Sequence, residues 1–416
     1  MCGNSLGLQP KLAAEYVADE MDKWGRLGVE GHFNGARPWV SIDEPCLPLL
    51  ADVVGAASTD EVGVMNTLSV NLHLLLTSFY QPTTERYKVI IEEAAFCSDH
   101  HVIRSQLALH NIPVDGGLIQ LKPRDGETYL QTSDILAAIK DAGASLALVL
   151  LPGIQFYTGQ LFDMRSITEA AHAVGAYCGF DLAHAVGNAA LQLHDWQVDF
   201  AAWCTYKYLN SGPGAIAGLF FHSRHHDNSS LHKLAGWWGQ TPQVRFQMKS
   251  EHQPIKGAQS YQLSNPAVLP TVCLYASLRT FDQAGGMKAL RAKSLLLTSY
   301  LEQLLSPLLA TLSMQILTPT ALSERGCQLS VRLGLPVRGV LKRMEAAGVL
   351  CDGREPNVIR LAPAPLYNNF SDVWRCVRVL AQAVNEEQQH IDQPLKETAG
   401  QGELQMKDGE PSERAG

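Results

Sequence analysis

Hydrophobic and polar positions along this 416-residue chain predict helices and buried strands in alternation. Residues 10–28 form an amphipathic helical pattern that includes Met21 and Trp24, and residues 66–79 form another, with Asn66 or Thr67 as the N-cap. Beyond them, apolar runs typical of buried strands are separated by helical patterns. The strand runs are 87–96, 144–153, 176–184, 199–207 and 214–221, and the helical patterns are 98–111, capped by Ser98, 134–143 and 166–175. This order favours a largely parallel sheet covered by helices on both faces.

The pattern changes near residue 285. A long helical segment at 286–305 is followed by short apolar strands at 314–319, 326–333 and 357–363, and then by a helix at 371–384. We expect four parts: an N-terminal segment (1–40), a large domain (41–285), a small α+β domain (286–390) and a tail (391–416). The tail is polar with few apolar residues, so it is predicted to be disordered.

Composition narrows the class of protein. The hydrophobic share of 46% and the charged share of 18% are typical of a globular protein, and a net charge of −8 without a basic run argues against nucleic acid as a partner. No apolar run approaches the length of about 20 residues that spans a membrane. The N-terminus lacks the features of a signal peptide, and residues 3–7 resemble a loop inside a domain, so we expect further sequence upstream. Nine cysteines without paired spacing predict reduced thiols and a cytoplasmic location.

Two residues near strand ends suggest chemistry. Lys207 follows the apolar run from Phe200 to Tyr206, where a charge is costly, and Asp181 ends another predicted strand, with His184 one turn further on. Carboxyl ends of parallel strands face one crevice. A buried lysine can form a Schiff base, and a carboxylate can keep a pyridine nitrogen protonated, which is the pairing of a pyridoxal 5'-phosphate site. On spacing alone, an Asp–Lys ion pair explains the two residues equally well or better.

Nearby residues fit the same chemistry. The helix start at Leu68 and Ser69 offers N–H groups to a phosphate, Tyr206 offers a phenol, and Phe96 offers a ring for stacking. Arg360, in an apolar strand, suits a carboxylate. Each also has an ordinary explanation as a helix cap, a core side chain or an internal salt bridge, so the residues taken singly leave the function open.

A set of motifs decides between these explanations. They are "GNSLGLQP", "VNLHLLLTSFYQPT", "FCSDHHVIRSQL", "FYTGQ", "GFDLAHAVGN", "LHDWQVDFAAWCTYKYLNSGPG", "GWWGQ", "SNPAVL", "RGCQLS" and "IRLAPAPLYN". With them the chain resembles the kynureninase family from residue 3 to about 385. The resemblance implies an α/β, fold-type I pyridoxal-phosphate enzyme, related to class V aminotransferases, with a large mostly parallel-sheet domain and a smaller C-terminal α+β domain. It also implies that the chain is of the eukaryotic type within that family and forms a homodimer.

The implied reaction is hydrolytic Cβ–Cγ cleavage of L-kynurenine or L-3-hydroxykynurenine to anthranilate or 3-hydroxyanthranilate and L-alanine, in tryptophan catabolism and NAD biosynthesis. The resemblance makes Lys207 the internal aldimine, Asp181 the partner of the pyridine nitrogen and Tyr206 a phosphate ligand and candidate proton shuttle. The implied cofactor pocket comprises Leu68, Ser69, Phe96, Cys97, Ser98, Asp99, Asp181, His184, Tyr206, Lys207, Trp237 and Asn265. The implied substrate contacts are His32, Asn265 and Arg360.

Within these implied roles, Arg360 binds the α-carboxylate of the substrate, and His32 and Asn265 lie near its aromatic ring. In the family this His and Asn accompany a preference for the 3-hydroxylated substrate. Trp237 and Asn265 are expected from the second subunit. The chain departs from the family in three ways: tens of residues before "GNSLG" are absent, Pro152 replaces a small hydroxyl residue and so implies one lost cofactor contact, and Ser69 stands where Thr is common.

Two other functions stay open at this stage. One is a different class V enzyme, an aminotransferase or a cysteine desulfurase. A desulfurase needs a nucleophilic cysteine on a mobile loop, whereas Cys327 and Cys351 lie in or beside predicted strands. The other is a cofactor-free scaffold. The histidines at 222, 225, 226 and 232 are predicted to lie in a solvated loop and His194 to be structural, so we expect no metal site.

Overall fold

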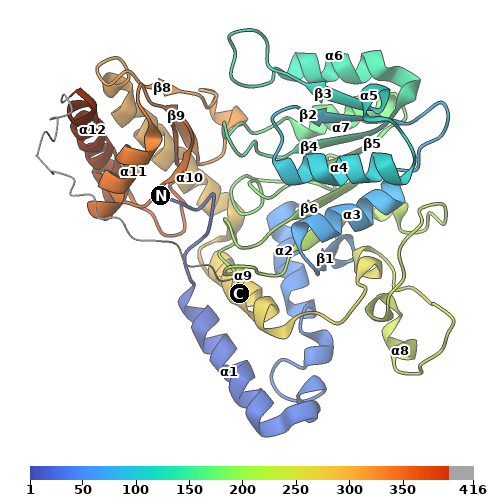
Figure 1. Ribbon diagram of the computed structural model, residues 1–416. Coiled ribbons are helices and arrows are strands. Elements are labelled where there is room, and N and C mark those ends of the chain that lie inside the picture. Colours follow the sequence, from blue (N-terminus) through green and yellow to red (C-terminus); the bar gives the residue numbers. More distant parts are fainter. Residues whose placement is uncertain (393–416) are drawn as a thin grey trace, which may run out of the picture.

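The computed structural model describes residues 1–392, and within them it contains a seven-stranded and a four-stranded sheet (Figure 1). The larger sheet has the order β1-β7-β6-β5-β4-β2-β3, and the smaller has the order β10-β11-β9-β8. The larger comprises β1 (Val62–Val64), β2 (Lys88–Glu92), β3 (Leu118–Leu121), β4 (Leu146–Pro152), β5 (Tyr177–Asp181), β6 (Phe200–Trp203) and β7 (Gly218–Phe221). The smaller comprises β8 (Gln315–Ile316), β9 (Leu329–Arg332), β10 (Asp352–Arg354) and β11 (Val358–Leu361).

Helices precede, separate and follow these strands. The helices are α1 (Lys11–Leu27), α2 (Leu47–Val54), α3 (Leu68–Phe79), α4 (Cys97–Leu109), α5 (Val114–Gly117), α6 (Thr132–Ala142), α7 (Met164–Ala173), α8 (Pro242–Arg245), α9 (Val268–Gln283), α10 (Gly286–Leu305), α11 (Val337–Ala346) and α12 (Phe370–Asp392). None of the helices within residues 1–392 is both long enough and apolar enough to cross a membrane. Apart from its first two residues, which end α12, the tail expected to be disordered lies outside the described residues.

The larger sheet is covered on both faces, as its continuous apolar strands predict. Strand side chains alternate between faces, and in β4 Leu148 and Leu150 belong to the core formed with α3 and α4, whereas Val149 and Leu151 belong to the core formed with α6 and α7. β7 runs antiparallel to both of its neighbours, and the other pairs are parallel. The carboxyl ends of β1, β2, β4, β5 and β6 therefore share one edge.

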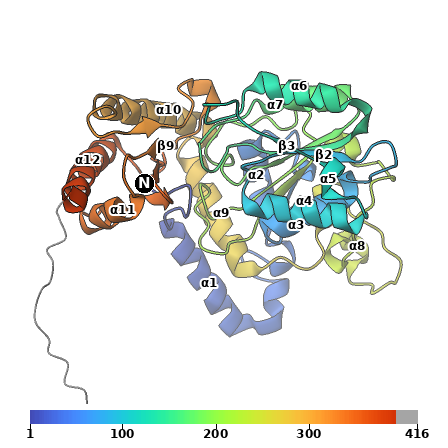
Figure 2. The same cartoon turned by 45° about the horizontal axis from the view of Figure 1, so that its top comes forward.

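The smaller sheet lies to one side of the larger in both views (Figures 1 and 2). Its strands form a separate core with α10, α11 and α12, for example around Val331, Leu361 and Leu380. The α/β fold with a second, smaller α+β part is thus confirmed. The exact domain limits at residues 40, 285 and 390 stay a prediction.

Two local predictions around the site were wrong. The strand before Lys207 ends at Trp203 and does not extend to Tyr206, because the backbone turns there and Ser211 N–H donates to Thr205 O at 3.2 Å. Lys207 therefore lies in the bend after the strand. Ser98 does not cap α4, since Phe96 occupies the N-cap and the Ser98 hydroxyl pairs instead with Ser69.

The apolar stripe of α1 is less buried than an amphipathic helix suggests. Met21 and Trp24 remain 47% and 61% exposed, whereas Glu20 and Lys23 are buried. Glu20 is buried with its charge satisfied, because it accepts hydrogen bonds from Arg37 and from the Trp39 indole and pairs with Lys23. The apolar side of α1 is left facing outward.

The histidines after β7 also differ from expectation. His222 and His225 are buried rather than solvated. Each buried histidine contacts an acidic residue from another part of the chain: Glu61 contacts His222, and Asp199 contacts His225. His194, which lies in the turn before β6, pairs with Glu61.

Candidate active site

A cavity opens at the carboxyl edge of the larger sheet. Its walls come from the segments that follow β1, β2, β4, β5 and β6 and from the loop before β7. The lining residues are Thr67, Leu68, Ser69, Phe96, Ser98, Asp99, Pro152, Ile154, Phe156, Asp181, Ala183, His184, Cys204, Tyr206, Lys207, Gly214 and Ala215. Most of the predicted cofactor residues therefore meet in one place, as parallel strands require.

One end of the cavity suits a phosphate. The first residues of α3 and α4 both line it, so two helix N-termini with free N–H groups point to the same region. The Ser69 and Ser98 hydroxyls lie 2.7 Å apart, one from each helix. Tyr206 lines the same cavity with its phenol. A phosphate dianion needs hydrogen-bond donors, and here both backbone N–H groups and hydroxyl groups can supply them.

The acidic wall of the cavity consists of Asp181 and Asp99, both buried. Burial raises the pKa of Asp181, and the Ala183 N–H at 2.8 Å and the charge of Lys207 act against that rise. Burial and the neighbouring Asp181 together hold the pKa of Asp99 well above its usual range. Asp99 is therefore the member that keeps its proton and can offer it to Asp181, which is the one that carries the charge.

Lys207 is held by a histidine. Its Nζ lies 3.0 Å from His184 Nε2, 6.0 Å from the centre of the Phe96 ring and 5.9 Å from that of Tyr206. Burial lowers the pKa of His184 well below its usual range, and the charges of Lys207 and Arg360 add to this. A neutral His184 accepts the hydrogen bond and aims the lysine into the cavity.

The N-terminal segment supports Lys207 from behind. Gly7 N–H donates to the Tyr206 carbonyl at 2.9 Å, and a Cβ on Gly7 would lie 2.4 Å from the Lys207 carbonyl oxygen. A side chain larger than hydrogen would therefore displace the bend that carries the lysine. The motif "GNSLG" thus shapes the site without lining it.

Arg360 lies behind the cavity wall. Its guanidinium is buried, pairs with Asp352 at 2.7 Å and donates to the Phe156 carbonyl at 2.6 Å, and Phe156 lines the cavity. The internal salt bridge that the sequence left open is therefore present. Phe156 stands between the guanidinium and the cavity, and binding of a substrate carboxylate by Arg360 stays a prediction.

Besides Arg360, four further predicted residues do not line this cavity in the single chain: His32, Cys97, Trp237 and Asn265. Trp237 is 46% exposed and donates its indole N–H to the Arg245 carbonyl at 2.9 Å. Asn265 is exposed as well. That Trp237 and Asn265 complete the pocket of a second subunit stays a prediction.

Two family descriptions match the chain. Aminotransferase class-V covers residues 48–327, and the kynureninase C-terminal domain covers residues 290–380. Kynureninase from Mus musculus is 48% identical over 92% of this chain and 83% of its own length. Kynureninase from Myxococcus xanthus is 50% identical over 91% of this chain and 88% of its own length.

The chain belongs to the kynureninase family. Among solved structures, a cysteine desulfurase from Thermococcus onnurineus has a TM-score of 0.74 at 16% identity, covering 92% of this chain and 94% of its own. A cystine C–S lyase in complex with cysteine persulfide has a TM-score of 0.75 at 14% identity, covering 91% and 96%. These likenesses confirm the fold-type I architecture, and membership of the kynureninase family gives pyridoxal 5'-phosphate as the cofactor and kynurenine cleavage as the reaction.

The cavity fits that cofactor of the kynureninase family. Lys207 and Asp181 both line it, the helix N-termini provide for a phosphate, and Asp99 leaves one buried carboxyl oxygen without a partner among the described residues. Sequence reasoning missed several of the residues that complete the walls: Thr67, Ile154, Phe156, Ala183, Cys204, Gly214 and Ala215. The sequence marks these residues only by their position, because they adjoin strand ends or predicted site residues.

Proposed function

We propose that the cavity around Lys207 is where this chain performs the reaction of its family, the hydrolysis of L-kynurenine and L-3-hydroxykynurenine to an anthranilate and L-alanine. The observation that carries the proposal is the meeting of Lys207, Asp181 and two helix N-termini in one cavity. Pyridoxal phosphate has an aldehyde, a pyridine nitrogen and a phosphate, and an amine, a carboxylate and a phosphate site in one cavity can bind these three groups.

The residues divide the work. When bound, the cofactor withdraws electrons from the α-carbon of an amino-acid substrate. Asp181 holds a proton on the pyridine nitrogen, and the Lys207 amine, once free, moves the α-proton while His184 orients it. Tyr206 has two roles. Its hydroxyl binds the phosphate, and it exchanges a proton during hydration of the γ-carbonyl. The Phe96 ring, on the cavity wall near Lys207, stacks on the pyridine.

Product analysis tests this function against the desulfurase alternative. The purified holoprotein, given L-kynurenine, 3-hydroxykynurenine or L-cysteine separately, should release anthranilates and alanine from the first two and no sulfide from the third. Cys327 is fully buried and burial raises its pKa to about 12, which argues against this cysteine as the mobile nucleophile of a desulfurase. Sulfide or a keto acid as the main product, detected by mass spectrometry, would reject the proposal.

Arg360 is proposed to bind the α-carboxylate of the substrate. Arg360→Lys keeps the charge and removes the bidentate fork, so KM for kynurenine should rise about 10- to 100-fold with a smaller change in kcat. The matched control is Asp352→Asn, which weakens the internal ion pair and leaves the guanidinium in place. If Arg360 served only that pair, both variants would lose thermal stability alike and neither would change KM.

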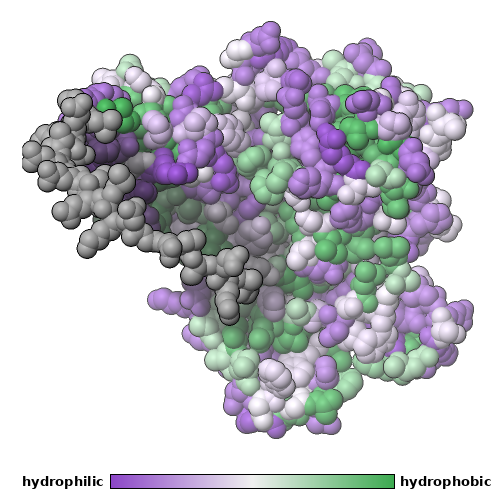
Figure 3. Space-filling model, in the orientation of Figure 1, coloured by the Kyte–Doolittle hydropathy of each residue, from purple (hydrophilic) through white to green (hydrophobic). Residues whose placement is uncertain are grey.

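We further propose that the chain acts as a cytoplasmic homodimer. The nine cysteines, all within the described residues, are free thiols, which supports a reducing compartment. Phe33, Trp237 and Phe246 form an aromatic cluster that is 59%, 46% and 51% exposed, with Phe246 5.8 Å and 5.7 Å from the other two ring centres. Apolar surface also gathers where α1 meets α9, around Trp24 and Leu269 (Figure 3). Such surface is typical of an interface.

Co-expression of two inactive chains tests the shared site. If Trp237 completes the pocket of its partner, a Lys207→Ala chain paired with a Trp237→Ala chain regains one intact site. Activity should then return to up to about half that of wild type per such dimer, because one of the two sites is complete. Absence of activity in dimers isolated with two affinity tags would place Trp237 outside the partner's site.

A further inference from the structure

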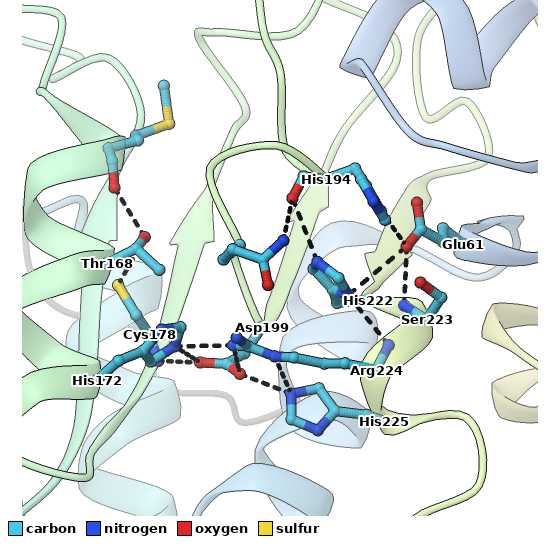
Figure 4. Close-up of polar contacts among 12 residues, drawn as sticks. Glu61, Thr168, His172, Cys178, His194, Asp199, His222, Ser223, Arg224 and His225 are labelled. Carbon is cyan, nitrogen blue, oxygen red and sulfur yellow. Dashed lines mark hydrogen bonds and ion pairs between the residues drawn. The ribbon is translucent and has the colours of Figure 1, made fainter.

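A second group of ionisable side chains lies at the opposite edge of the larger sheet. Glu61 precedes β1, His222 follows β7, and His194 lies in the turn that leads to β6 (Figure 4). The amino ends of β1 and β6 and the carboxyl end of the antiparallel β7 meet at this edge, whereas the cofactor cavity is at the other edge. The group is therefore separate from the catalytic machinery.

The three side chains converge on one point. Glu61 Oε1 lies 2.8 Å from His194 Nδ1 and 3.7 Å from His222 Nδ1, and one ligand atom from each residue lies within 4.8 Å of the others. The two imidazole rings stack with their centres 4.7 Å apart. Glu61 has no exposed surface, and His222 is 3% exposed. A carboxylate and imidazoles are common ligands of zinc.

The protonation of the group suits a cation. Burial alone raises the pKa of Glu61, but hydrogen bonds from Ser223 N–H, His194 and Ala57 N–H outweigh it and hold the pKa below its usual value. Glu61 is thus an anion. Burial lowers the pKa of His222 to about 4, so its ring is neutral.

The hydrogen bonds of His222 assign its tautomer. Its Nε2–H donates to the His194 carbonyl at 3.2 Å, which leaves the Nδ1 lone pair on the side of Glu61. That lone pair meets the Arg224 backbone N–H at 3.1 Å. A bound metal would replace this contact.

We propose that Glu61, His194 and His222 bind a divalent first-row metal ion, with Zn²⁺ the best fit. Tetrahedral Zn²⁺ with bonds of about 2.0–2.2 Å separates its ligand atoms by about 3.3 Å, which falls between the two distances from Glu61 Oε1. His194 releases Nδ1 by moving its proton to Nε2, a tautomer shift that leaves the charge of the ring unchanged. Water occupies the fourth position.

The surroundings support the site. The His194 side chain is 30% exposed, which gives an ion a route inward. The Arg224 guanidinium, two residues after His222 in the sequence, is paired with Asp199, which also contacts His172 and His225 (Figure 4). Backbone N–H groups of Ala57 and Ser223 fix the Glu61 carboxylate as outer partners do in metal sites. The ion would tie three separate segments to one edge of the sheet.

Zinc titration of the pyridoxal-phosphate-loaded protein tests this. After treatment with a chelator, the protein is given ZnCl₂ alone, and bound metal and Tm are measured. We expect one tightly bound ion per chain, and a Tm rise of about 3 °C at a hundredfold excess over Kd. His194→Gln and His222→Gln should each weaken binding at least about tenfold and remove the Tm rise. Turnover of kynurenine should stay unchanged in His194→Gln, because the cofactor lies at the opposite edge.

The control is His226→Gln, which removes a histidine of the same loop that bonds to the Phe221 carbonyl and not to Glu61. It should bind zinc as wild type does. Because cysteines also bind zinc, Co²⁺ is added in a parallel experiment, where the visible absorption of a tetrahedral nitrogen–oxygen site should vanish in His194→Gln. Because His194 is partly exposed, the His194→Gln variant should fold, and it tests zinc binding at this site even if His222→Gln does not fold. Equal binding by wild type and His194→Gln, or no binding by wild type, overturns the proposal.

Discussion

Replacement of Lys207 by alanine is expected to abolish the covalent link to the cofactor and to lower kcat for kynurenine by about 10³-fold or more. The lysine is proposed both to bind the cofactor aldehyde and to move the α-proton, so one substitution removes two functions. Borohydride reduction followed by peptide mapping should find the pyridoxyl group on the peptide that contains Lys207 in wild type, and nowhere in the variant. Added methylamine should restore part of the lost rate, because a small amine can replace the missing base.

The matched control is Lys233→Ala. Burial lowers the pKa of Lys233 to about 8, so this lysine is also a candidate for reaction with an aldehyde, but it bonds to Ser260 and does not line the cavity. The control should keep both the pyridoxyl group on Lys207 and full turnover. A trapped pyridoxyl group on any lysine of Lys207→Ala, or turnover near the wild-type rate, would contradict the assignment.

The meeting of Lys207 and Asp181 could be predicted from the sequence, because the rule for carboxyl ends of parallel strands is general. The exact end of the strand before Lys207 could not. The run from Phe200 to Tyr206 is apolar apart from Thr205, and the strand ends early because Thr205 bonds to Ser211 and to the Ile216 carbonyl across the turn. Those partners become neighbours only in the folded chain.

Other elements were missed for different reasons. In α2, Leu47, Leu50, Ala51 and Val54 are buried at helical spacing, but the helix has only eight residues and Asp52 is its one charged side chain, so the pattern is too short to stand out in the sequence. β1 and β10 have three residues each, which is too short for an alternation to stand out. These elements depend on tertiary packing more than on local pattern.

The histidines after β7 show the same limit. His222 and His225 stand among Asn, Ser and Asp residues, and local composition therefore predicted a solvated loop. Their burial depends on Glu61 and Asp199, which precede strands elsewhere in the chain. The local sequence holds no sign of these contacts, so neither the burial nor the proposed metal site could be predicted from it.

The two aspartates of the cavity also became a pair only in the fold. Asp99 follows β2 and Asp181 ends β5, and in sequence each was a separate cofactor residue. Buried together, they share one negative charge: burial and the charge of Asp181 raise the pKa of Asp99, while the Ala183 N–H and Lys207 favour the ionised form of Asp181. Their roles are therefore opposite, although their side chains are identical.

Amide substitutions should separate these roles. Asp181→Asn removes the charge that keeps the pyridine nitrogen protonated, so kcat should fall about 10²- to 10³-fold and the cofactor should dissociate more readily on dialysis. Asp99→Asn replaces a protonated carboxyl by an amide that still donates to Asp181, so kcat should stay within about tenfold of wild type. Steady-state kinetics and cofactor retention, measured side by side, decide the matter. A loss in Asp99→Asn as large as in Asp181→Asn would mean that the charge resides on Asp99, or is shared, and that the protonation derived from burial is wrong.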